Sequence, residues 1–196
     1  MFGLRVEPGE TPVGDVEPWG KTDRQILRGV LARAGLPAPD DESLTRWEGA
    51  ACEAYERLEV SDGTTEHAAT GEALAGLRDA GHALALLTGN LEAIARRKLS
   101  LRGLGDYFPR GQGAFGSDAE RRPELVPIAR ARAGGVPRDR TVLIGDTPLD
   151  VAAARADGVR AVAITGHRFS AEALLEAGAT ATVDDLAELE AVLAGL

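Results

Sequence analysis

The chain has 196 residues, of which 44% are hydrophobic and 27% are charged, as is usual for a globular protein. Its net charge of −9 and its pI of about 4.9 argue against a broad surface for nucleic acid or for an anionic membrane. A single cysteine, Cys52, excludes an internal disulfide and a cysteine-based metal cluster.

The first part of the chain predicts two helices after a start that is rich in turn-forming residues. Pro and Gly recur through residues 1–20 and break any long regular element. From Thr22 apolar residues recur at helical spacing until Gly35, and a second helix is predicted over residues 40–59. We expect these helices to form a small helical cap domain, residues 1–66.

From about residue 67 the pattern changes to helices that alternate with short apolar strands. Strands are predicted at 82–87, 114–115, 141–144, 160–164 and 181–183. This alternation predicts an α/β fold, a Rossmann-like doubly wound parallel sheet with helices on both faces, as the core domain over residues 67–196.

The strand predicted over residues 82–87 runs into Thr88, Gly89 and Asn90. In open parallel sheets the ligand site lies beyond the carboxyl ends of the strands. A hydroxyl at that point, beside the free N–H groups of a following helix, suits an anion. The alternative is that Thr88 or Asn90 only caps the helix, and for this motif alone the cap is the default interpretation.

A second strand, 141–144, is followed by Gly145 and Asp146, with Asp150 four residues further on. Pro148 fits the first turn of a helix, so both carboxylates are expected near the sheet edge. Paired carboxylates suit Mg²⁺, which prefers oxygen ligands. The alternative is that Asp150 complements the helix dipole and Asp146 fills a turn. We favour the metal site, because an acid directly follows four apolar strand residues.

Arg122 lies between these two segments, just before Pro123, which can begin a helix. Alone it would be taken as a solvated surface charge. A hydroxyl, a cation and paired acids, in this chain order and at strand-to-helix junctions, resemble the haloacid dehalogenase-like hydrolase superfamily. Its phosphoglycolate-phosphatase-like members are the most similar.

The resemblance implies roles in binding phosphate. Thr88 matches the second motif of the family and would donate a hydrogen bond to the phosphate, helped by the backbone N–H of Gly89 or Asn90. Arg122 matches the third motif, with Arg121 as the fallback, and would neutralise charge in the transition state.

The resemblance also implies a metal site and a cap contact. Gly145, Asp146 and Asp150 match the Gly-Asp-x-x-x-Asp motif, whose two acids would bind Mg²⁺ or hold its waters. The stretch 19–23 is similar to one found in the helical cap of such enzymes. Lys21 within it is a candidate substrate contact, although a surface lysine is the simpler interpretation.

The first motif of the family, Asp-x-Asp-x-Thr on a central strand, does not occur in the sequence. Asp15-Val16-Glu17 comes nearest but follows no apolar strand, and Asp184-Asp185 lacks the intervening residue. In the family this strand lies between the strands that end at Thr88 and Asp146. Our hypothesis is that the sequence is truncated by roughly 20–30 residues, the usual length of a strand, a loop and much of a helix.

The resemblance implies a Mg²⁺-dependent phosphatase that hydrolyses a small phosphorylated metabolite through an aspartyl-phosphate. The alternative is a non-catalytic binding or regulatory protein of the same fold. Dehalogenase or phosphonatase chemistry stays open without the first motif. We expect no nucleic-acid or membrane partner and a cytoplasmic location, since no signal peptide or bilayer-length apolar stretch is found.

Overall fold

The computed structural model describes residue 2 and residues 16–57, 68–166 and 168–196. The predicted order of helices and strands is largely confirmed in these ranges. The α-helices are α1 (Asp23–Arg33), α2 (Asp41–Glu56), α3 (Ala68–Asp79), α4 (Glu92–Leu101), α5 (Arg122–Arg132), α6 (Pro148–Asp157), α7 (Ala171–Glu176) and α8 (Leu189–Ala194). The strands are β1 (Val142–Gly145), β2 (Arg160–Ile164) and β3 (Ala181–Val183), and short 3-10 turns are η2 (Gly105–Tyr107), η3 (Arg138–Arg140) and η4 (Leu186–Glu188).

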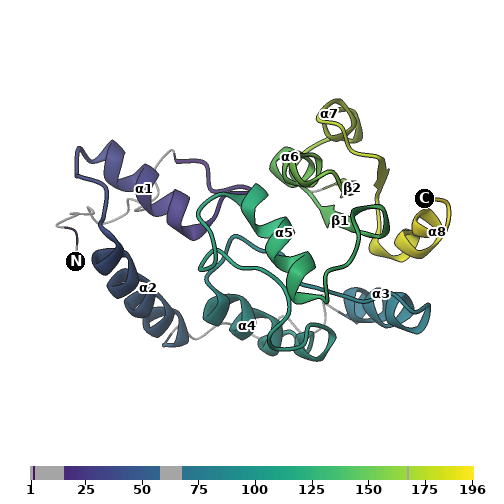
Figure 1. The fold of residues 1–196 in the computed structure, drawn as a ribbon, viewed down its shortest axis with the longest axis horizontal. Coiled ribbons are helices and arrows are strands. Elements are labelled where there is room, and N and C mark those ends of the chain that lie inside the picture. Colours follow the sequence, from purple (N-terminus) through teal and green to yellow (C-terminus); the bar gives the residue numbers. More distant parts are fainter. Residues whose placement is uncertain (1, 3–15, 58–67, 167) are drawn as a thin grey trace.

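The three strands form a parallel sheet in the order β1-β2-β3. Side chains of β2 alternate between two cores: Ala161 and Ala163 face one, Val162 and Ile164 the other. Helices α5, α6 and α7 contribute to the first core, and α3 and α8 to the second (Figure 1). Both faces are therefore covered, as expected for a doubly wound sheet, and the predicted fold class is confirmed.

The segment 82–87 differs from the prediction of a strand. Within the described residues only Leu87 pairs, through an isolated parallel bridge to Ala114. Leu84 and Leu87 pack against the two cores of the sheet, whereas Ala83 and Ala85 are exposed. A strand needs backbone partners along its edge, and here Ala114 is the one described residue that bridges to the segment.

The outer edge of β1 is also unpaired in the described part of the chain, where β1 ends the sheet. Ile144 on this strand is 36% exposed, although strands covered on both faces normally bury such residues. An open, apolar strand edge favours the addition of another strand.

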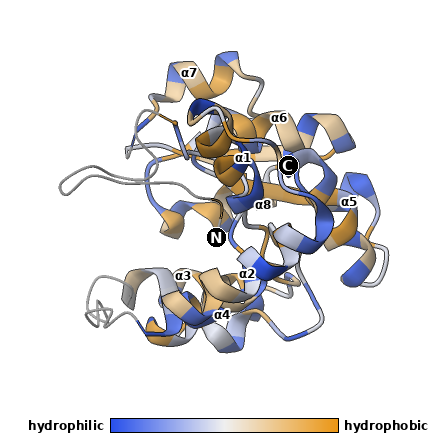
Figure 2. Cartoon of the chain, turned by 90° about the vertical axis from the view of Figure 1, so that its left-hand side faces the viewer, coloured by the Kyte–Doolittle hydropathy of each residue, from blue (hydrophilic) through white to orange (hydrophobic). Residues whose placement is uncertain are grey.

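Helices α1 and α2 lie at one end of the molecule, away from the sheet (Figure 1). Leu27, Leu31 and Leu44 form a small apolar cluster between them. Figure 2 shows that the helices carry hydrophobic residues on part of their surface and hydrophilic residues on the rest. Residues 58–67 lie outside the described ranges, so the domain boundary at 66/67 stays a prediction.

The only cysteine lies in α2. Burial, followed by the negative charges of Glu48 and Glu56, raises the pKa of the Cys52 thiol above its usual value. A protonated thiol is a poor nucleophile, and this direction agrees with the expectation that Cys52 is not reactive. No helix among the described residues is both long enough and apolar enough to span a bilayer.

Candidate active site

Arg122 and Asp150, two predicted site residues, form a buried ion pair. Arg122 begins α5, and Asp150 lies in the first turn of α6. Arg122 Nη2 lies 2.5 Å from Asp150 Oδ1, and the two side chains are 15% and 3% exposed. The structure thus joins the predicted cation to one of the predicted acids, 28 positions apart in the sequence (150 − 122).

Asp150 lies in the first turn of its own helix, where the alternative interpretation has it complement the helix dipole, and it also takes part in capping that helix. Its Oδ2 accepts hydrogen bonds from the N–H of Thr147 at 3.1 Å and from the Thr147 hydroxyl at 2.7 Å. The Asp150 N–H donates to Thr147 Oγ1 at 3.2 Å, which completes a capping box. One oxygen of the carboxylate therefore holds the helix, and the other faces Arg122.

Two buried polar atoms at this pair lack a hydrogen bond. These are Arg122 Nε and Asp150 Oδ1; the contact of Oδ1 with Arg122 has the distance of an ion pair but not the geometry of a hydrogen bond. Buried polar atoms are normally satisfied, because leaving one unpaired costs about 1–3 kcal/mol. Unsatisfied polar atoms such as Arg122 Nε and Asp150 Oδ1 are expected at a place where a ligand or its waters bind.

Asp146, the other predicted acid, directly follows β1 and is exposed. Its carboxylate makes no hydrogen bond or ion pair with any described residue. Together, Asp146 and the unsatisfied Oδ1 of Asp150 offer oxygen ligands of the kind that Mg²⁺ takes while it keeps several waters. The described residues contain no group of three His, Cys, Asp or Glu side chains placed to hold a metal ion, so the donors fit only a metal bound largely through water and substrate.

The turn at Thr88 leaves a hydroxyl free to donate. Thr88 Oγ1 accepts the N–H of Asn90 at 3.2 Å, so the hydroxyl proton remains available to a ligand. The Asn90 side chain is engaged instead: its amide donates to Asp23 Oδ1 at 3.1 Å and accepts from Lys98 Nζ at 2.8 Å. Burial lowers the pKa of Lys98, and the charge of Asp23 opposes that shift. Of the predicted phosphate donors, the Thr88 hydroxyl is free, whereas the backbone N–H of Asn90 is already used within the turn.

The residues that lead into α1 hold this turn in place. Asp23 Oδ2 accepts the N–H of Leu91 at 2.8 Å, and the N–H of Asp23 donates to the carbonyl of Gly89 at 2.8 Å. Thr22 is fully buried, and its hydroxyl donates to the carbonyl of Glu120 at 2.5 Å, two residues before Arg122. Thr22 and Asp23 therefore connect the predicted phosphate turn to the segment that carries the predicted cation.

Gly20 extends these contacts to the third part of the site. A Cβ added to Gly20 would stand 2.7 Å from Thr147 Oγ1, so the backbone lies directly on the first turn of α6. The Gly20–Asp23 segment thus touches all three predicted motifs. The sequence indicated Thr22 only as a helix start and as part of the stretch 19–23 that is similar to a segment of the helical cap. The contacts of Thr22 and Asp23 join residues 67 to 98 positions apart, and no local pattern indicates them.

Lys21 lies within the Gly20–Asp23 segment. Its carbonyl packs on Gly89, where an added Cβ would stand 2.2 Å away. Its side chain is partly exposed and makes no hydrogen bond or ion pair with the described residues. Lys21 is therefore next to the predicted phosphate turn, and its contact with substrate stays a prediction.

We expect Asp23→Asn to loosen the Thr88 turn, because an amide cannot accept from both Leu91 N–H and Asn90. The loss of one hydrogen bond to a charged acceptor should lower the free energy of unfolding by about 1.5–3 kcal/mol. Adding the reciprocal change Asn90→Asp should restore part of it, since the carboxylate introduced there can accept both from the new amide and from Lys98. Urea unfolding and hydrogen exchange of the Leu91 amide measure both effects.

Asp40→Asn is the matched control for that experiment. Asp40 also accepts a backbone N–H at a helix N-terminus, that of Ser43 in α2, but it is exposed. The Asp40→Asn variant should leave hydrogen exchange of the Leu91 amide unchanged. Equal exchange at Leu91 in wild-type and Asp23→Asn proteins would show that Asp23 does not hold the turn.

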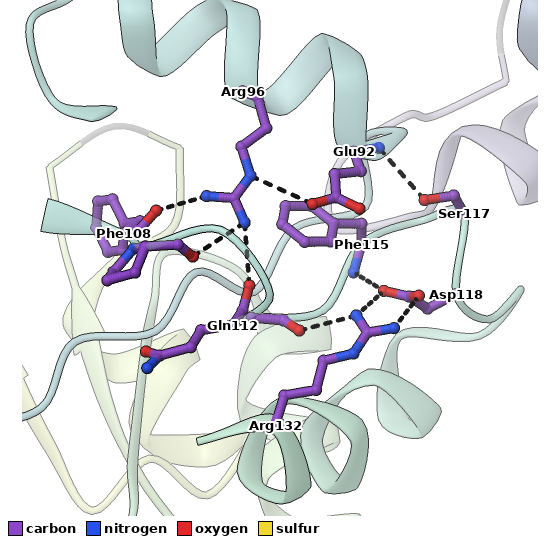
Figure 3. A network of polar contacts seen from close by, with 10 residues as sticks. Glu92, Arg96, Phe108, Gln112, Phe115, Ser117, Asp118 and Arg132 are labelled. Carbon is purple, nitrogen blue, oxygen red and sulfur yellow. Dashed lines mark hydrogen bonds and ion pairs between the residues drawn. The ribbon is translucent and has the colours of Figure 1, made fainter. Parts of the chain in front are cut away.

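A network of polar contacts joins α4 and Arg132 to the loop that follows α4 (Figure 3). Arg96 of α4 donates to three carbonyls of the following loop: Phe108 at 2.5 Å, Pro109 at 3.2 Å and Gln112 at 3.1 Å. Arg132 pairs with both carboxylate oxygens of Asp118 at 2.7 and 2.6 Å. This loop also carries Gly116, whose N–H donates to the carbonyl of Asn90 at 2.8 Å. The network therefore fixes the loop against which the turn packs.

Asp118 predicts a dependence of stability on acid pH. Burial raises the pKa of Asp118, but hydrogen bonds from Arg132 and the Phe115 N–H outweigh burial, and the net pKa lies below 3.8. Between the unfolded pKa and the lower folded pKa, unfolding therefore takes up a proton, so the stabilisation is full above about pH 4 and is lost as the pH falls through the folded pKa. Asp118→Asn should cost about 1.5–3 kcal/mol at pH 7. That difference should shrink on acidification, as denaturant unfolding at pH 7 and pH 3 would show.

Comparison with known proteins decides the family. The family model described as haloacid dehalogenase-like hydrolase matches residues 38–164, which is more than half of the chain. The chain belongs to the haloacid dehalogenase-like hydrolase family. The resemblance inferred from Thr88, Arg122 and the Gly145–Asp150 motif is thereby confirmed at the level of the family.

Relatives by sequence in this family include phosphoglycolate phosphatases. That of Rhodospirillum rubrum is 35% identical over 119 residues, 59% of this chain and 48% of the relative. The plasmid-encoded one of Cupriavidus necator is 36% identical over 121 residues, 61% of this chain and 52% of the relative. The matched region thus spans about half the length of these relatives.

Two solved structures illustrate the shared fold. A phosphonoacetaldehyde hydrolase-like protein from Oleispira antarctica superposes with a TM-score of 0.64 at 17% identity, covering 98% of this chain and 80% of that one. A family hydrolase from Deinococcus radiodurans with bound phosphate and sodium gives a TM-score of 0.57 at 23% identity, covering 98% and 82%. At these identities the likeness shows the fold alone.

Proposed function

We propose that the chain forms the phosphate- and metal-binding part of a Mg²⁺-dependent phosphatase for a small phosphorylated metabolite. The carrying observation is the buried Arg122–Asp150 pair with its unsatisfied Nε and Oδ1, which the Gly20–Asp23 segment connects to Thr88. The sequence relatives named phosphoglycolate phosphatase support this class of substrate.

Each residue has a role in this proposal. Arg122 directs its free Nε at phosphate oxygens and balances charge that develops in the transition state. The Thr88 hydroxyl and the N–H of Gly89 donate to the same phosphate. Asp146 and Asp150 hold Mg²⁺, which neutralises phosphate charge when bound. Helices α1 and α2 act as the cap, from which Lys21 reaches the substrate.

The nucleophile must come from elsewhere, because the sequence contains no Asp-x-Asp motif. We propose that an aspartate on an extended strand adds to the open edge of β1 and forms the aspartyl-phosphate. Exposed Ile144, and residues 83–85, which no described residue pairs with, favour a strand in this position. The intact mass of the protein from its native source tests this: a mass a few kilodaltons above 20.5 kDa supports it.

The absent motif favours a second candidate, a non-catalytic protein that binds metal and phosphate without turning over an ester. An intact mass that matches 20.5 kDa would favour this candidate. Hydrolysis of p-nitrophenyl phosphate with Mg²⁺ separates the two further. If protein of native mass binds phosphate but does not hydrolyse the ester, the result supports the non-catalytic binding protein.

Titration of the 196-residue chain with inorganic phosphate in the presence of Mg²⁺ tests the site itself. Arg122→Lys keeps the charge but loses the planar fork, so the dissociation constant should rise about tenfold or more. Arg121→Lys is the matched control. Arg121 is the neighbour of Arg122 in the sequence, but its side chain is 72% exposed and pairs with Glu124. An equal effect of both changes, or of Arg121→Lys alone, would refute the role given to Arg122.

A further inference from the structure

An exposed arginine is stacked on an exposed tryptophan near the candidate active site. The guanidinium carbon of Arg168 lies 3.6 Å from the centroid of the Trp19 ring, a close cation–π contact. Trp19 is 47% exposed, which is unusual for so large an apolar side chain. Arg168 is exposed too, and it forms no ion pair or hydrogen bond with a described residue. Its donors are thus held in place by a ring and are free to bind.

Both residues lie at the same edge of the sheet as the predicted motifs. Trp19 precedes Gly20, whose backbone lies on Thr147 at the start of α6. Arg168 follows the carboxyl end of β2, which pairs in parallel with β1, the strand that ends at Asp146. The carboxyl ends of parallel strands meet at one edge, so the Trp19–Arg168 pair stands at the rim of the candidate site.

We propose that the Trp19–Arg168 pair binds a second anionic group of the substrate. The substrate class would then be phosphate monoesters whose alcohol part carries a carboxylate or another phosphate. This inference rests on the proposed phosphatase site, which binds the first phosphate.

Arginine suits that role, since its planar guanidinium binds carboxylate and phosphate in a bidentate way. Stacking on Trp19 fixes the plane of the guanidinium in advance, so less rotamer freedom is lost on binding. If Arg168 instead only covered the indole ring, its removal would alter stability and leave ligand preference unchanged.

The test compares two esters of nearly equal size, propyl phosphate and 2-carboxyethyl phosphate, which differ by one carboxylate. Isothermal titration of the 196-residue chain with Mg²⁺ should show the carboxylate ester binding about five- to tenfold more tightly, as expected for a partly solvated charged contact. Arg168→Ala should abolish this preference and leave the affinity for propyl phosphate unchanged. Arg168→Glu should reverse it in favour of the cationic ester 2-aminoethyl phosphate.

Arg140→Ala is the matched control. Arg140 is exposed like Arg168 but precedes β1, at the opposite edge of the sheet. It should leave the preference intact. Trp19→Phe, which keeps an aromatic ring, should retain more of the preference than Trp19→Ala.

The outcomes separate the two proposals. If wild-type protein binds both esters equally, the second-anion site is refuted while the phosphate site stands. Unequal binding that Arg168→Ala does not change also refutes the role of Arg168. If neither ester binds, the proposed phosphatase site fails and the second-anion site falls with it.

Discussion

Replacing Asp150 by asparagine should lower the free energy of unfolding by about 3–5 kcal/mol, because it leaves Arg122 as an unpaired charge in a buried position. The amide can still accept from Thr147, so the loss should come mainly from the ion pair. For a chain of this length the thermal midpoint should fall by about 6–20 °C. Denaturant unfolding at pH 7 measures the energy directly.

Asp146→Asn is the control that separates structure from metal binding. Asp146 is exposed and unpaired among the described residues, so its stability should change by no more than about 0.5 kcal/mol. The affinity of this variant for Mg²⁺ should nevertheless fall at least tenfold, in titrations of the metal with inorganic phosphate present. A loss below about 1 kcal/mol for Asp150→Asn would contradict the buried pair. Unchanged Mg²⁺ affinity in Asp146→Asn would remove that residue from the metal site.

Gly116→Ala should also be strongly destabilising, by about 3 kcal/mol or more, because the added methyl group has no space. A Cβ on Gly116 would stand 2.0 Å from the carbonyl oxygen of Gly89 and 2.8 Å from its carbonyl carbon. These are backbone atoms of the predicted phosphate turn, so the clash cannot be relieved by a side-chain rotation. The change should therefore weaken binding of inorganic phosphate as well as stability, by titration and by thermal unfolding.

Gly49→Ala is the matched substitution at a site with space. Gly49 lies inside α2, and no atom comes within 4 Å of an added Cβ. Alanine favours the helix, so this variant should gain up to about 1 kcal/mol. If Gly116→Ala were as stable as wild type, the loop and the turn could not be packed as closely as the structure has them.

Local sequence patterns were sufficient to predict the order of elements and the family. The helices predicted from apolar spacing after Thr22 and from Pro148 are present as α1 and α6, and the structure shows Thr22 and Thr147 as their caps. β2 alternates between two cores and is continuously apolar over residues 161–164, as buried parallel strands are. Capping, periodicity and apolar runs are local properties, so they can be recognised without knowing the fold. Thr88, Arg122 and Asp146 stand at strand-to-helix junctions, but Thr88 and Arg122 became site candidates only as part of a set that resembles the family, and the roles of all three stay predictions.

How these parts meet became known only from the packed chain. In the structure Arg122 forms an ion pair with Asp150. The Asn90 side chain forms hydrogen bonds with Asp23 and Lys98. It also reduced the predicted strand at 82–87 to a single bridge, because strand formation depends on a neighbouring edge that the segment's own residues do not encode. Such contacts join residues far apart in the chain, and their energies depend on burial and geometry that arise only once the elements have packed.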